Sequence, residues 1–204
     1  MLYSVNREPG RSVYGEELIQ EGGRELRHWD PWRSKLAALV LKHGEKVLPE
    51  APRRVLYLGA AHGTTASHLS DLWPESSIFV VERSPVAFSR LLDLARRRPN
   101  LLPILADAQL PERYAADVGP VDFLYQDVAQ RAQAAIFAEN ARAAAAERVP
   151  GILMLKTRSV TQRQPTKEIV RLAQDELGRH QLEVRASVDL TPFARDHAAL
   201  LIGP

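Results

Sequence analysis

Four ionisable side chains, widely separated in the sequence, have the types that an enzyme needs to activate a hydroxyl group. Lys35 lies in an early helix-like segment, Asp127 and Lys156 each end an apolar run, and His197 comes just before the last such run. Each of them alone is more often an ordinary solvated residue. If they converge, a lysine beside a carboxylate and a second cation can help a hydroxyl group to attack, either as the base or by stabilising the alkoxide. A free lysine titrates near ~10.4, so the role of base requires a lowered pKa.

A second group of residues, small and close together, forms a turn that a ligand could approach. The stretch VLYLGAAHGTT passes from an apolar run into Gly59, Ala60, Ala61 and Gly63, and then into a helix-like pattern. Residues this small let a ligand lie close to the backbone. Their G-x-x-x-G spacing differs from the G-x-G-x-x-G of dinucleotide sites, so we disfavour NAD. The turn alone is weak support for a site, because many such turns are purely structural.

Acidic residues at the ends of further strand-like runs extend this possible site. Glu82 ends SIFVVE, where an acid can accept hydrogen bonds from a ribose diol. Asp107 follows PILA, where an acid could meet a base edge or an amine. Each acid could also be a solvated cap or turn residue. Together with Asp127 they favour a nucleoside ligand without a large phosphate group, which indicates S-adenosylmethionine; the hydroxyl oxygen would then attack its sulfonium methyl group.

The elements that must position these residues follow a repeated pattern of strand, turn and helix. Strands are predicted over 53–58, 77–82, 101–106, 121–127, 151–156, 182–190 and 198–202, and helices over 64–73, 85–97, 131–148 and about 165–179. Ser84 suits an N-cap and Pro85 the first helical position. Apolar strands alternating with helices predict an α/β fold with a mainly parallel, seven-stranded sheet covered on both faces. Ligands bind such sheets beyond the carboxyl ends of the strands, where the strand order reverses.

The first 30 residues differ from the rest of the chain. SVYGEELI and RELRHW flank the turn-forming QEGG and predict a β-hairpin. We therefore expect a short N-terminal β extension over 1–30 and the main domain over 31–204. The main domain would begin with a helix in DPWRSKLAALVLKHGEKVL, broken or ended near Gly44.

Composition excludes several classes of function. The chain has 204 residues, with 27 Lys and Arg against 25 Asp and Glu, so charge alone demands no nucleic-acid partner. It has no Cys, which excludes disulfides, thiolate zinc sites and cysteine nucleophiles, and we predict no metal site. No window approaches the roughly 18 to 20 apolar residues of a membrane span. We expect a soluble protein of the cytoplasm.

Six motifs, in order along residues 12–202, resemble those of one known family. They are WDPWRSKLAALV, VLYLGAAHGTTASHLSDL, ILADAQ, VDFLYQDVAQ, LMLKTRS and TPFARDHAAL. The chain is similar to the fibrillarin family, in particular to its archaeal RNA 2′-O-methyltransferases. The resemblance implies a Rossmann-like methyltransferase fold, S-adenosylmethionine as the methyl donor, and transfer to ribose 2′-hydroxyls of rRNA or tRNA in an archaeal cell. It also implies a catalytic Lys-Asp-Lys-His set, here Lys35, Asp127, Lys156 and His197.

The resemblance further implies which residues hold the donor. They are Gly59, Ala60, Ala61, Thr64, Thr65, Glu82, Asp107, Ala108, Asp127 and Gln130. Three positions depart from the family pattern. His62 stands where Ser is common, Arg83 where an aromatic residue usually lies against the adenine, and Phe193 where Tyr is commoner. An arginine can also stack on an adenine, so we include Arg83, with Gly63, in the predicted donor site.

The resemblance also implies partners. Family members act with a box C/D guide RNA that pairs with the target RNA, a Nop-domain scaffold protein and a kink-turn-binding ribosomal-type protein. Among the basic stretches of this chain, TRSVTQRQ over 157–164 is the best candidate for RNA contact, because it follows Lys156 directly. For Trp29, Trp32 and Trp73 we expect core or interface packing rather than base stacking.

Two other functions are compatible with the sequence. A structural subunit would keep the fold, with or without the donor site, but methylate nothing; the complete Lys-Asp-Lys-His set argues against it, whereas Arg83 and the short N-terminal region leave it open. A stand-alone methyltransferase of a small alcohol or a protein side chain would act without guide RNA. Substitution of Asp127 or Lys156 distinguishes an enzyme from a structural subunit.

Overall fold

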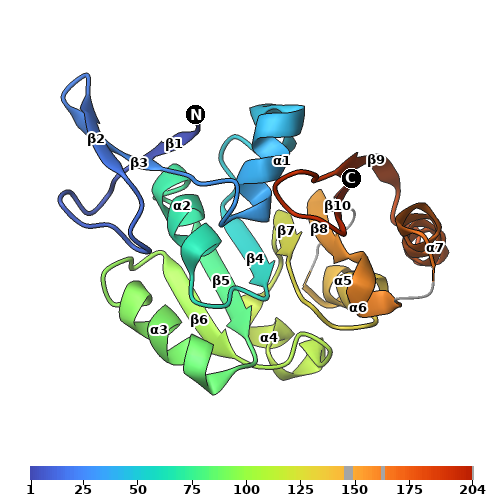
Figure 1. The fold of residues 1–204 in the computed structure, drawn as a ribbon. Coiled ribbons are helices and arrows are strands. Elements are labelled where there is room, and N and C mark those ends of the chain that lie inside the picture. The colour runs from blue at the N-terminus through green and yellow to red at the C-terminus, as the bar shows by residue number, and fades with distance from the viewer. Residues whose placement is uncertain (145–148, 162–163, 204) are drawn as a thin grey trace.

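A computed structural model of the chain describes residues 1–144, 149–161 and 164–203, which form a central sheet, a small N-terminal sheet and surrounding helices (Figure 1). The strands are β1 (Tyr3–Val5), β2 (Leu18–Glu21), β3 (Arg24–His28), β4 (Arg54–Leu58), β5 (Ser77–Glu82), β6 (Leu101–Leu105), β7 (Phe123–Gln126), β8 (Gly151–Lys156), β9 (Val184–Asp189) and β10 (His197–Ile202). The helices are α1 (Lys35–His43), α2 (Thr64–Leu72), α3 (Pro85–Ala95), α4 (Ala115–Val118), α5 (Gln133–Ala144), α6 (Thr157–Val160) and α7 (Thr166–Arg179), with 3-10 turns η1 (Glu45–Val47) and η2 (Pro111–Arg113).

The central sheet confirms the predicted mainly parallel, seven-stranded arrangement. Its order is β6-β5-β4-β7-β8-β10-β9. The strands from β6 to β8 pair in parallel, and β10 runs antiparallel to both of its neighbours. The chain builds β4, β5 and β6 outward in one direction and then places β7 on the other side of β4. The strand order therefore reverses between β4 and β7, which is where a crevice for a ligand is expected.

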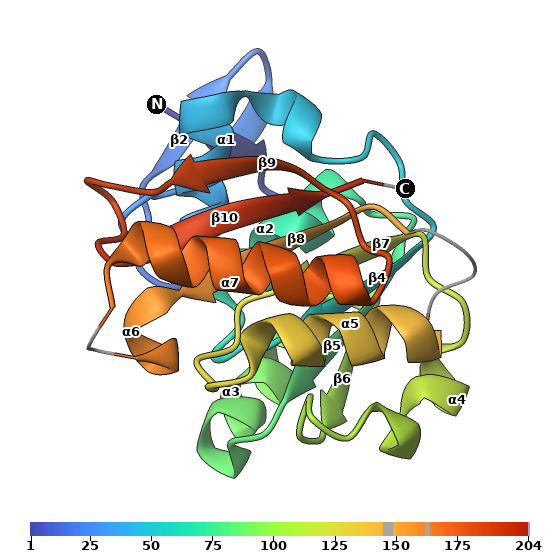
Figure 2. The same cartoon turned by 90° about the vertical axis from the view of Figure 1, so that its right-hand side faces the viewer.

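Helices cover both faces of this sheet because successive strand residues point to opposite sides. In β4, Val55 and Tyr57 join a core with residues of α1, α2 and α3, whereas Leu56 and Leu58 join a core with residues of α5 and α7. Figure 2 shows α5 and α7 lying side by side over the second face. A strand that is buried on both sides reads as a continuous apolar run, which is why the sequence revealed it.

The ends of the helices follow the signals in the sequence. Ser34 accepts a hydrogen bond from the Ala37 backbone N–H at 3.3 Å and so caps α1. Ser84 caps α3 in the same way, with a proline in the first turn. Helix α1 ends at Gly44, whose φ of +92° favours glycine. These local features orient α1 and α3 on the first face of the sheet.

The N-terminal residues form a three-stranded antiparallel sheet in the order β1-β3-β2. The predicted hairpin is present as β2 and β3, joined through Gly22 and Gly23 at φ values of +57° and +75°. Strand β1 adds to it and packs against α2. The sequence did not indicate β1, because a strand of three residues is too short to show a period of two.

Some predicted elements differ in extent. The helix expected over 131–148 is α5, which the structure describes over Gln133–Ala144, and residues 145–148 lie outside the described residues. The basic stretch at 157–164 begins with α6, and its residues 162 and 163 also lie outside the described part. The short α4 was not predicted, since four residues carry too little periodicity to show a helix.

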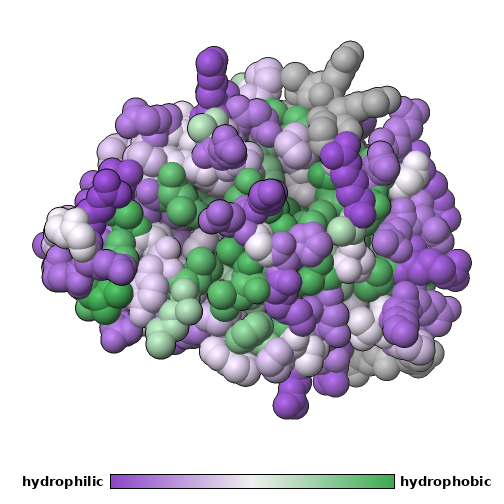
Figure 3. Space-filling view, turned by 90° about the horizontal axis from the view of Figure 1, so that it is seen from above, coloured by the Kyte–Doolittle hydropathy of each residue, from purple (hydrophilic) through white to green (hydrophobic). Residues whose placement is uncertain are grey.

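The outer surface is mixed in polarity. Figure 3 looks down on the molecule and shows apolar side chains in the middle of this face between hydrophilic margins. Across residues 1–144, 149–161 and 164–203, no helix combines the length and the apolar character that crossing a membrane requires.

Candidate active site

The turn after β4 brings two strand ends into close contact. Gly59 has a φ of +81°, and a Cβ there would lie 2.6 Å from the backbone oxygen of Asp127. Its N–H donates to the Val81 carbonyl at 2.9 Å, and the Asp127 N–H donates to the Leu58 carbonyl at 2.9 Å. A side chain at position 59 would therefore push apart the ends of β4 and β7. The small residue that the sequence singled out is required by backbone packing as well as by access for a ligand.

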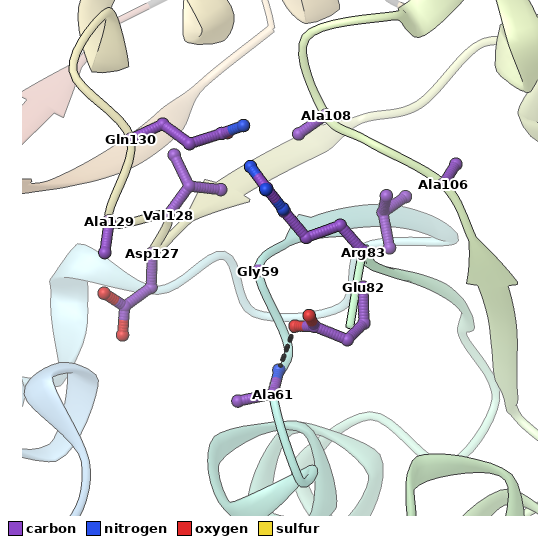
Figure 4. A pocket seen from close by; sticks show the side chains of 11 residues that line it. Gly59, Ala61, Glu82, Arg83, Ala106, Ala108, Asp127, Val128, Ala129 and Gln130 are labelled. Atoms are coloured by element: carbon purple, nitrogen blue, oxygen red, sulfur yellow. Dashed lines mark hydrogen bonds between the residues drawn. The ribbon is translucent and has the colours of Figure 1, made fainter. Parts of the chain in front are cut away.

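Glu82 fastens this turn from the end of β5. One carboxylate oxygen accepts from the Ala61 N–H at 2.9 Å, drawn as the dashed line in Figure 4, and the other accepts from the Ser84 N–H at 2.7 Å. The side chain is buried, yet each oxygen has a second lone pair. Glu82 can therefore hold the turn and still accept hydrogen bonds from a ligand.

A cavity of about 340 Å³ opens beside the turn (Figure 4). This volume suits a small-molecule site. Predicted donor-site residues make up much of its wall: Gly59, Ala61, Glu82, Arg83, Ala108, Asp127 and Gln130. Val81, Ala106, Val128 and Ala129 complete the lining. The sequence did not mark these four, because small and apolar residues at strand ends have the same composition as core residues.

Other predicted donor-site residues stand behind the lining and build the turn. Ala60 is buried in the core, and Thr64 opens α2. The Thr65 hydroxyl shares a hydrogen bond of 2.9 Å with the Ser34 hydroxyl, which ties α2 to the start of α1. At Gly63, with φ of +89°, a Cβ would lie 2.5 Å from the Leu94 side chain.

Asp107 is not part of the cavity lining but lies between two lining residues, Ala106 and Ala108, and holds two others, Gln130 and Arg83. Its carboxylate accepts from Gln130 Nε2 at 2.8 Å and from the Gln109 N–H at 3.0 Å, and it lies 3.5 Å from Arg83 Nη1. Burial alone would raise the pKa of Asp107, but these hydrogen bonds and the Arg83 charge lower it below its usual range. Figure 4 shows the Arg83 side chain extended across the cavity toward Gln130. Arginine at position 83, where the family pattern usually has an aromatic residue, thus places a cation in the wall of the cavity.

Lys35 and Asp127 form an ion pair at the same edge. Lys35 Nζ lies 2.8 Å from Asp127 Oδ2, and the two side chains are 28% and 18% exposed. Asp127 also lines the cavity. One carboxylate therefore belongs both to the cavity and to the charged cluster beside it.

Lys156 and His197 lie opposite each other in the antiparallel pair of β8 and β10. Gln133, a buried residue of α5, holds Lys156 through its backbone: the Gln133 amide donates to the Lys156 carbonyl at 3.0 Å and accepts from its N–H at 2.8 Å. This role was not predicted, because a glutamine in an alanine-rich helix looks like a surface residue. Gln133 therefore fixes the backbone position from which the Lys156 side chain extends at the end of β8.

The two pairs lie at the same edge of the sheet, because Asp127 follows β7, Lys156 ends the parallel neighbour β8, and His197 is opposite Lys156. Burial lowers the pKa of His197, the charges of Lys35 and Lys156 lower it further, and the Arg195 carbonyl and Asp127 oppose this. His197 Nδ1 lies 2.7 Å from the Arg195 carbonyl oxygen. Since a carbonyl only accepts, Nδ1 carries a proton, and the neutral ring keeps its lone pair on Nε2. The structure therefore brings a neutral imidazole, two ammonium groups and a carboxylate to one edge of the sheet.

The comparisons with known proteins agree with this geometry. A family model described as fibrillarin matches residues 1–203. The chain belongs to the fibrillarin family. A fibrillarin-like rRNA/tRNA 2′-O-methyltransferase of Thermoplasma acidophilum is 43% identical, over 94% of this chain and 82% of the relative. One of Methanopyrus kandleri is 40% identical, over 96% of this chain and 85% of the relative.

Solved fibrillarin structures resemble the chain over almost its whole length. Methanococcus jannaschii fibrillarin, a pre-rRNA processing protein, has a TM-score of 0.92 at 36% identity and covers 98% of this chain and 87% of its own. Aeropyrum pernix fibrillarin, solved with natively bound S-adenosyl-L-methionine, has a TM-score of 0.85 at 40% identity, with the same coverage. A fibrillarin/Nop5p complex has a TM-score of 0.88 at 38% identity and covers 98% and 92%.

The structure also bears on two departures from the fibrillarin pattern. His62 is exposed and lines a separate cavity with Thr64 and Arg33, so it does not belong to the wall beside Gly59. Phe193 contacts Trp32, with ring centroids 5.1 Å apart. Neither residue disturbs the contacts of Glu82 or Asp127 described above.

Proposed function

We propose that this chain transfers a methyl group from S-adenosylmethionine to a ribose 2′-hydroxyl of rRNA or tRNA. The observation that carries the proposal is the shared carboxylate: Asp127 both lines the cavity and pairs with Lys35. A donor held in the cavity and a hydroxyl held by the cluster would meet at that residue. The names of the archaeal relatives and the donor bound to the Aeropyrum pernix protein support this assignment.

The residues of the cavity suit the donor. Glu82 has lone pairs that can accept hydrogen bonds from the ribose diol, and Asp107 has lone pairs that can accept a hydrogen bond from an N–H group on the adenine edge. The small residues of the turn, Gly59 and Ala61, leave room for the backbone to approach the amino-acid part. The donor supplies a methyl group on a positively charged sulfur, which leaves as a neutral thioether.

The charged cluster prepares the attacking oxygen. As the 2′-oxygen forms a bond to the methyl carbon, the carbon–sulfur bond breaks and the hydroxyl proton passes to a basic group of the cluster. Lys35 and Lys156 stabilise the negative charge that develops on the oxygen. Asp127 orients Lys35 through the 2.8 Å ion pair, and Gln133 fixes the backbone of Lys156.

We further propose that the chain works inside a guide ribonucleoprotein of the archaeal cytoplasm. The fibrillarin/Nop5p complex supports a Nop-domain scaffold as partner. A box C/D guide RNA would choose the target nucleotide, and a kink-turn-binding protein would complete the particle. Arg158, which is 71% exposed in α6 two residues after Lys156 and pairs with Asp196 at 2.8 Å, would contact the phosphates of the target strand.

Reconstitution with labelled donor tests this function. The chain is incubated with guide-matched RNA, with and without the scaffold, the kink-turn protein and the guide. We expect methylation of one ribose only when every part is present, and none when the target nucleotide carries a 2′-deoxyribose. An assembled particle that binds donor but methylates nothing would favour a structural subunit. Transfer to an alcohol or a protein without guide RNA would favour a stand-alone enzyme.

A further inference from the structure

Trp32 differs from the other two tryptophans of the chain. Trp29 and Trp73 are buried in the core, 1% and 5% exposed, as expected for packing residues, whereas Trp32 is 63% exposed. Its only ring contact among the described residues is an edge-on one with Phe193, at 5.1 Å and 71°. An exposed tryptophan ring offers a large apolar face with a polar N–H, a combination that is enriched where proteins contact a ligand or partner.

The backbone that carries Trp32 is fixed in relation to Lys35. The Trp32 N–H donates to Asp30 Oδ1 at 2.8 Å, and the Ser34 N–H donates to the Asp30 carbonyl at 3.0 Å. Ser34 then caps α1 and is bonded to Thr65. Three residues after Trp32, Lys35 reaches Asp127. The ring therefore stands on a hydrogen-bonded turn that directly precedes the helix supplying Lys35.

Phe193 brings a second segment to the same place. It lies in the loop between β9 and β10, which runs beside α1 in Figure 1. Lys42 Nζ donates to the Thr191 carbonyl, and the Thr191 N–H donates to Asp189 Oδ1 at 2.8 Å, so the loop is held two residues before Phe193. His197 follows Phe193 by four residues. The two rings thus join the segments that supply Lys35 and His197.

We propose that Trp32, backed by Phe193, is an RNA-contacting residue that packs in the minor groove of the guide–target duplex, against the sugar edge of a nucleotide beside the methylated one. This inference rests on the proposed function. The minor groove of A-form RNA is wide and shallow and displays the 2′-hydroxyls. Lys35 and Asp127 are recessed, whereas Trp32 projects, so a 2′-oxygen that reaches the cluster brings its neighbour against the ring.

The charge around the two rings favours RNA over an apolar protein surface. Arg33 follows Trp32, and Arg195 follows Phe193 by two residues; both arginines are exposed. Cations that flank an exposed aromatic ring suit a ligand with phosphates at its edges and apolar sugar and base atoms between them. The rings would set how deeply the 2′-oxygen enters the cluster.

Single-turnover methylation by the complete particle, at saturating donor, tests this contact. Trp32→Ala is expected to lower the rate roughly 10-fold or more, and Trp32→Phe, which keeps an aromatic face, to stay within about threefold of the unsubstituted chain. Leu172→Ala is the matched control, since Leu172 is an exposed apolar residue of α7, 42% exposed, and no change is expected there. Donor affinity and thermal unfolding should be the same in all four proteins.

Tryptophan fluorescence provides a readout that does not depend on catalysis. Trp32 is the exposed indole, so a target RNA with a 2′-deoxyribose at the methylation site should protect it from acrylamide quenching, and this protection should be absent in Trp32→Phe. If the RNA protects Trp32 from quenching but no particle methylates it, the proposed RNA contact stands and the proposed function is wrong. An unchanged rate in Trp32→Ala, or loss of scaffold binding by that variant, would overturn the proposal, the second by making the ring a protein contact.

Discussion

Two clusters of charged residues in this chain have similar composition but different surroundings. Under the N-terminal sheet, Arg27 pairs with Glu16 and Asp71 at 2.6 Å each, and Arg98 pairs with Asp71 as well. Their side chains are at most 2% exposed. At the carboxyl edge of the sheet, Lys35 and Asp127 pair at 2.8 Å but remain 28% and 18% exposed. We call the first the sealed cluster and the second, with Lys156 and His197, the open cluster.

A histidine next to the sealed cluster, His68, and the histidine of the open cluster, His197, show the same contrast. His68 of α2 shares hydrogen bonds with Ser4 at 2.7 Å and Tyr14 at 2.8 Å through its two ring nitrogens and stacks on Trp29. Burial, with the charges of Arg27 and Arg98, lowers the pKa of His68 to about 2. In His197, by contrast, Nδ1 is hydrogen-bonded to the Arg195 carbonyl, and Nε2 remains available to a substrate.

The difference separates charges that hold the fold from charges that can act on a substrate. In the sealed cluster the protein supplies the partners, so that removing one partner leaves a buried charge uncompensated. In the open cluster part of each group faces solvent, where a substrate atom can enter. The same residue types therefore stabilise in one place and can catalyse in the other.

The largest expected effect is on catalysis, from Asp127→Asn in the open cluster. The change keeps the shape of the side chain but removes the charge that orients Lys35. We expect the single-turnover methylation rate to fall roughly 10²- to 10⁴-fold, because general acid–base groups contribute about that much. The free energy of unfolding, measured by urea denaturation, should change little. Asp175→Asn, in an exposed pair on α7, is the control and should leave the rate unchanged; a normal rate in Asp127→Asn would remove Asp127 from the mechanism.

The next effect is on stability, from Asp71→Asn in the sealed cluster. Arg27 and Arg98 would each lose the charge of a buried partner. We expect urea denaturation to show a loss of about 3–5 kcal/mol. Asp175→Asn should cost about 0.5 kcal/mol or less, because its pair is exposed. Equal losses in both variants would show that the sealed cluster stabilises the fold no more than an exposed pair does.

A smaller effect concerns the pH dependence of stability. In the unfolded chain His68 becomes protonated below about pH 6.5, whereas in the folded chain it stays neutral until the pH approaches about 2. The free energy of unfolding should therefore fall with acidification through this window, by roughly 1 kcal/mol between pH 7 and 5.5 from this one residue. His68→Gln should remove that part of the slope in denaturation curves at several pH values. If the slope is unchanged, His68 is not sealed in solution.

The smallest effect is expected at Arg83, on the rim of the cavity. Arg83 is 61% exposed, and its ion pair with Asp107 is long, at 3.5 Å. This pair therefore contributes little to stability. Arg83→Tyr should tighten donor binding a few-fold, because a flat ring stacks on adenine at a gain of about 0.5–1.5 kcal/mol. Isothermal titration calorimetry with S-adenosylmethionine measures this, with Arg83→Gln as the control for loss of charge alone. Weaker binding in Arg83→Tyr would show that the arginine itself holds the donor.

Much of the fold was predictable because its signals are local. Apolar runs such as 151–156 and capping residues such as Ser84 need no distant partner to be recognised. The β1 strand and α4 were missed, because three or four residues carry too little periodicity. In the site, Glu82 and Asp127 could be named since they end apolar runs. Gln133 could not, because its role depends on α5 lying against β8.

The sequence by itself determined the alternation of strands and helices from β4 onward, apart from the short α4 and α6, the small-residue turn at 59–63, and which acids and bases lie at strand ends. It also determined the family, through motifs that persist along the chain. Only the tertiary structure decided which charges are sealed and which are open, and which tryptophan remains exposed. Burial is a property of residues that meet from distant segments: Asp71 is enclosed by Arg27 and Arg98, and Trp32 projects beside Phe193.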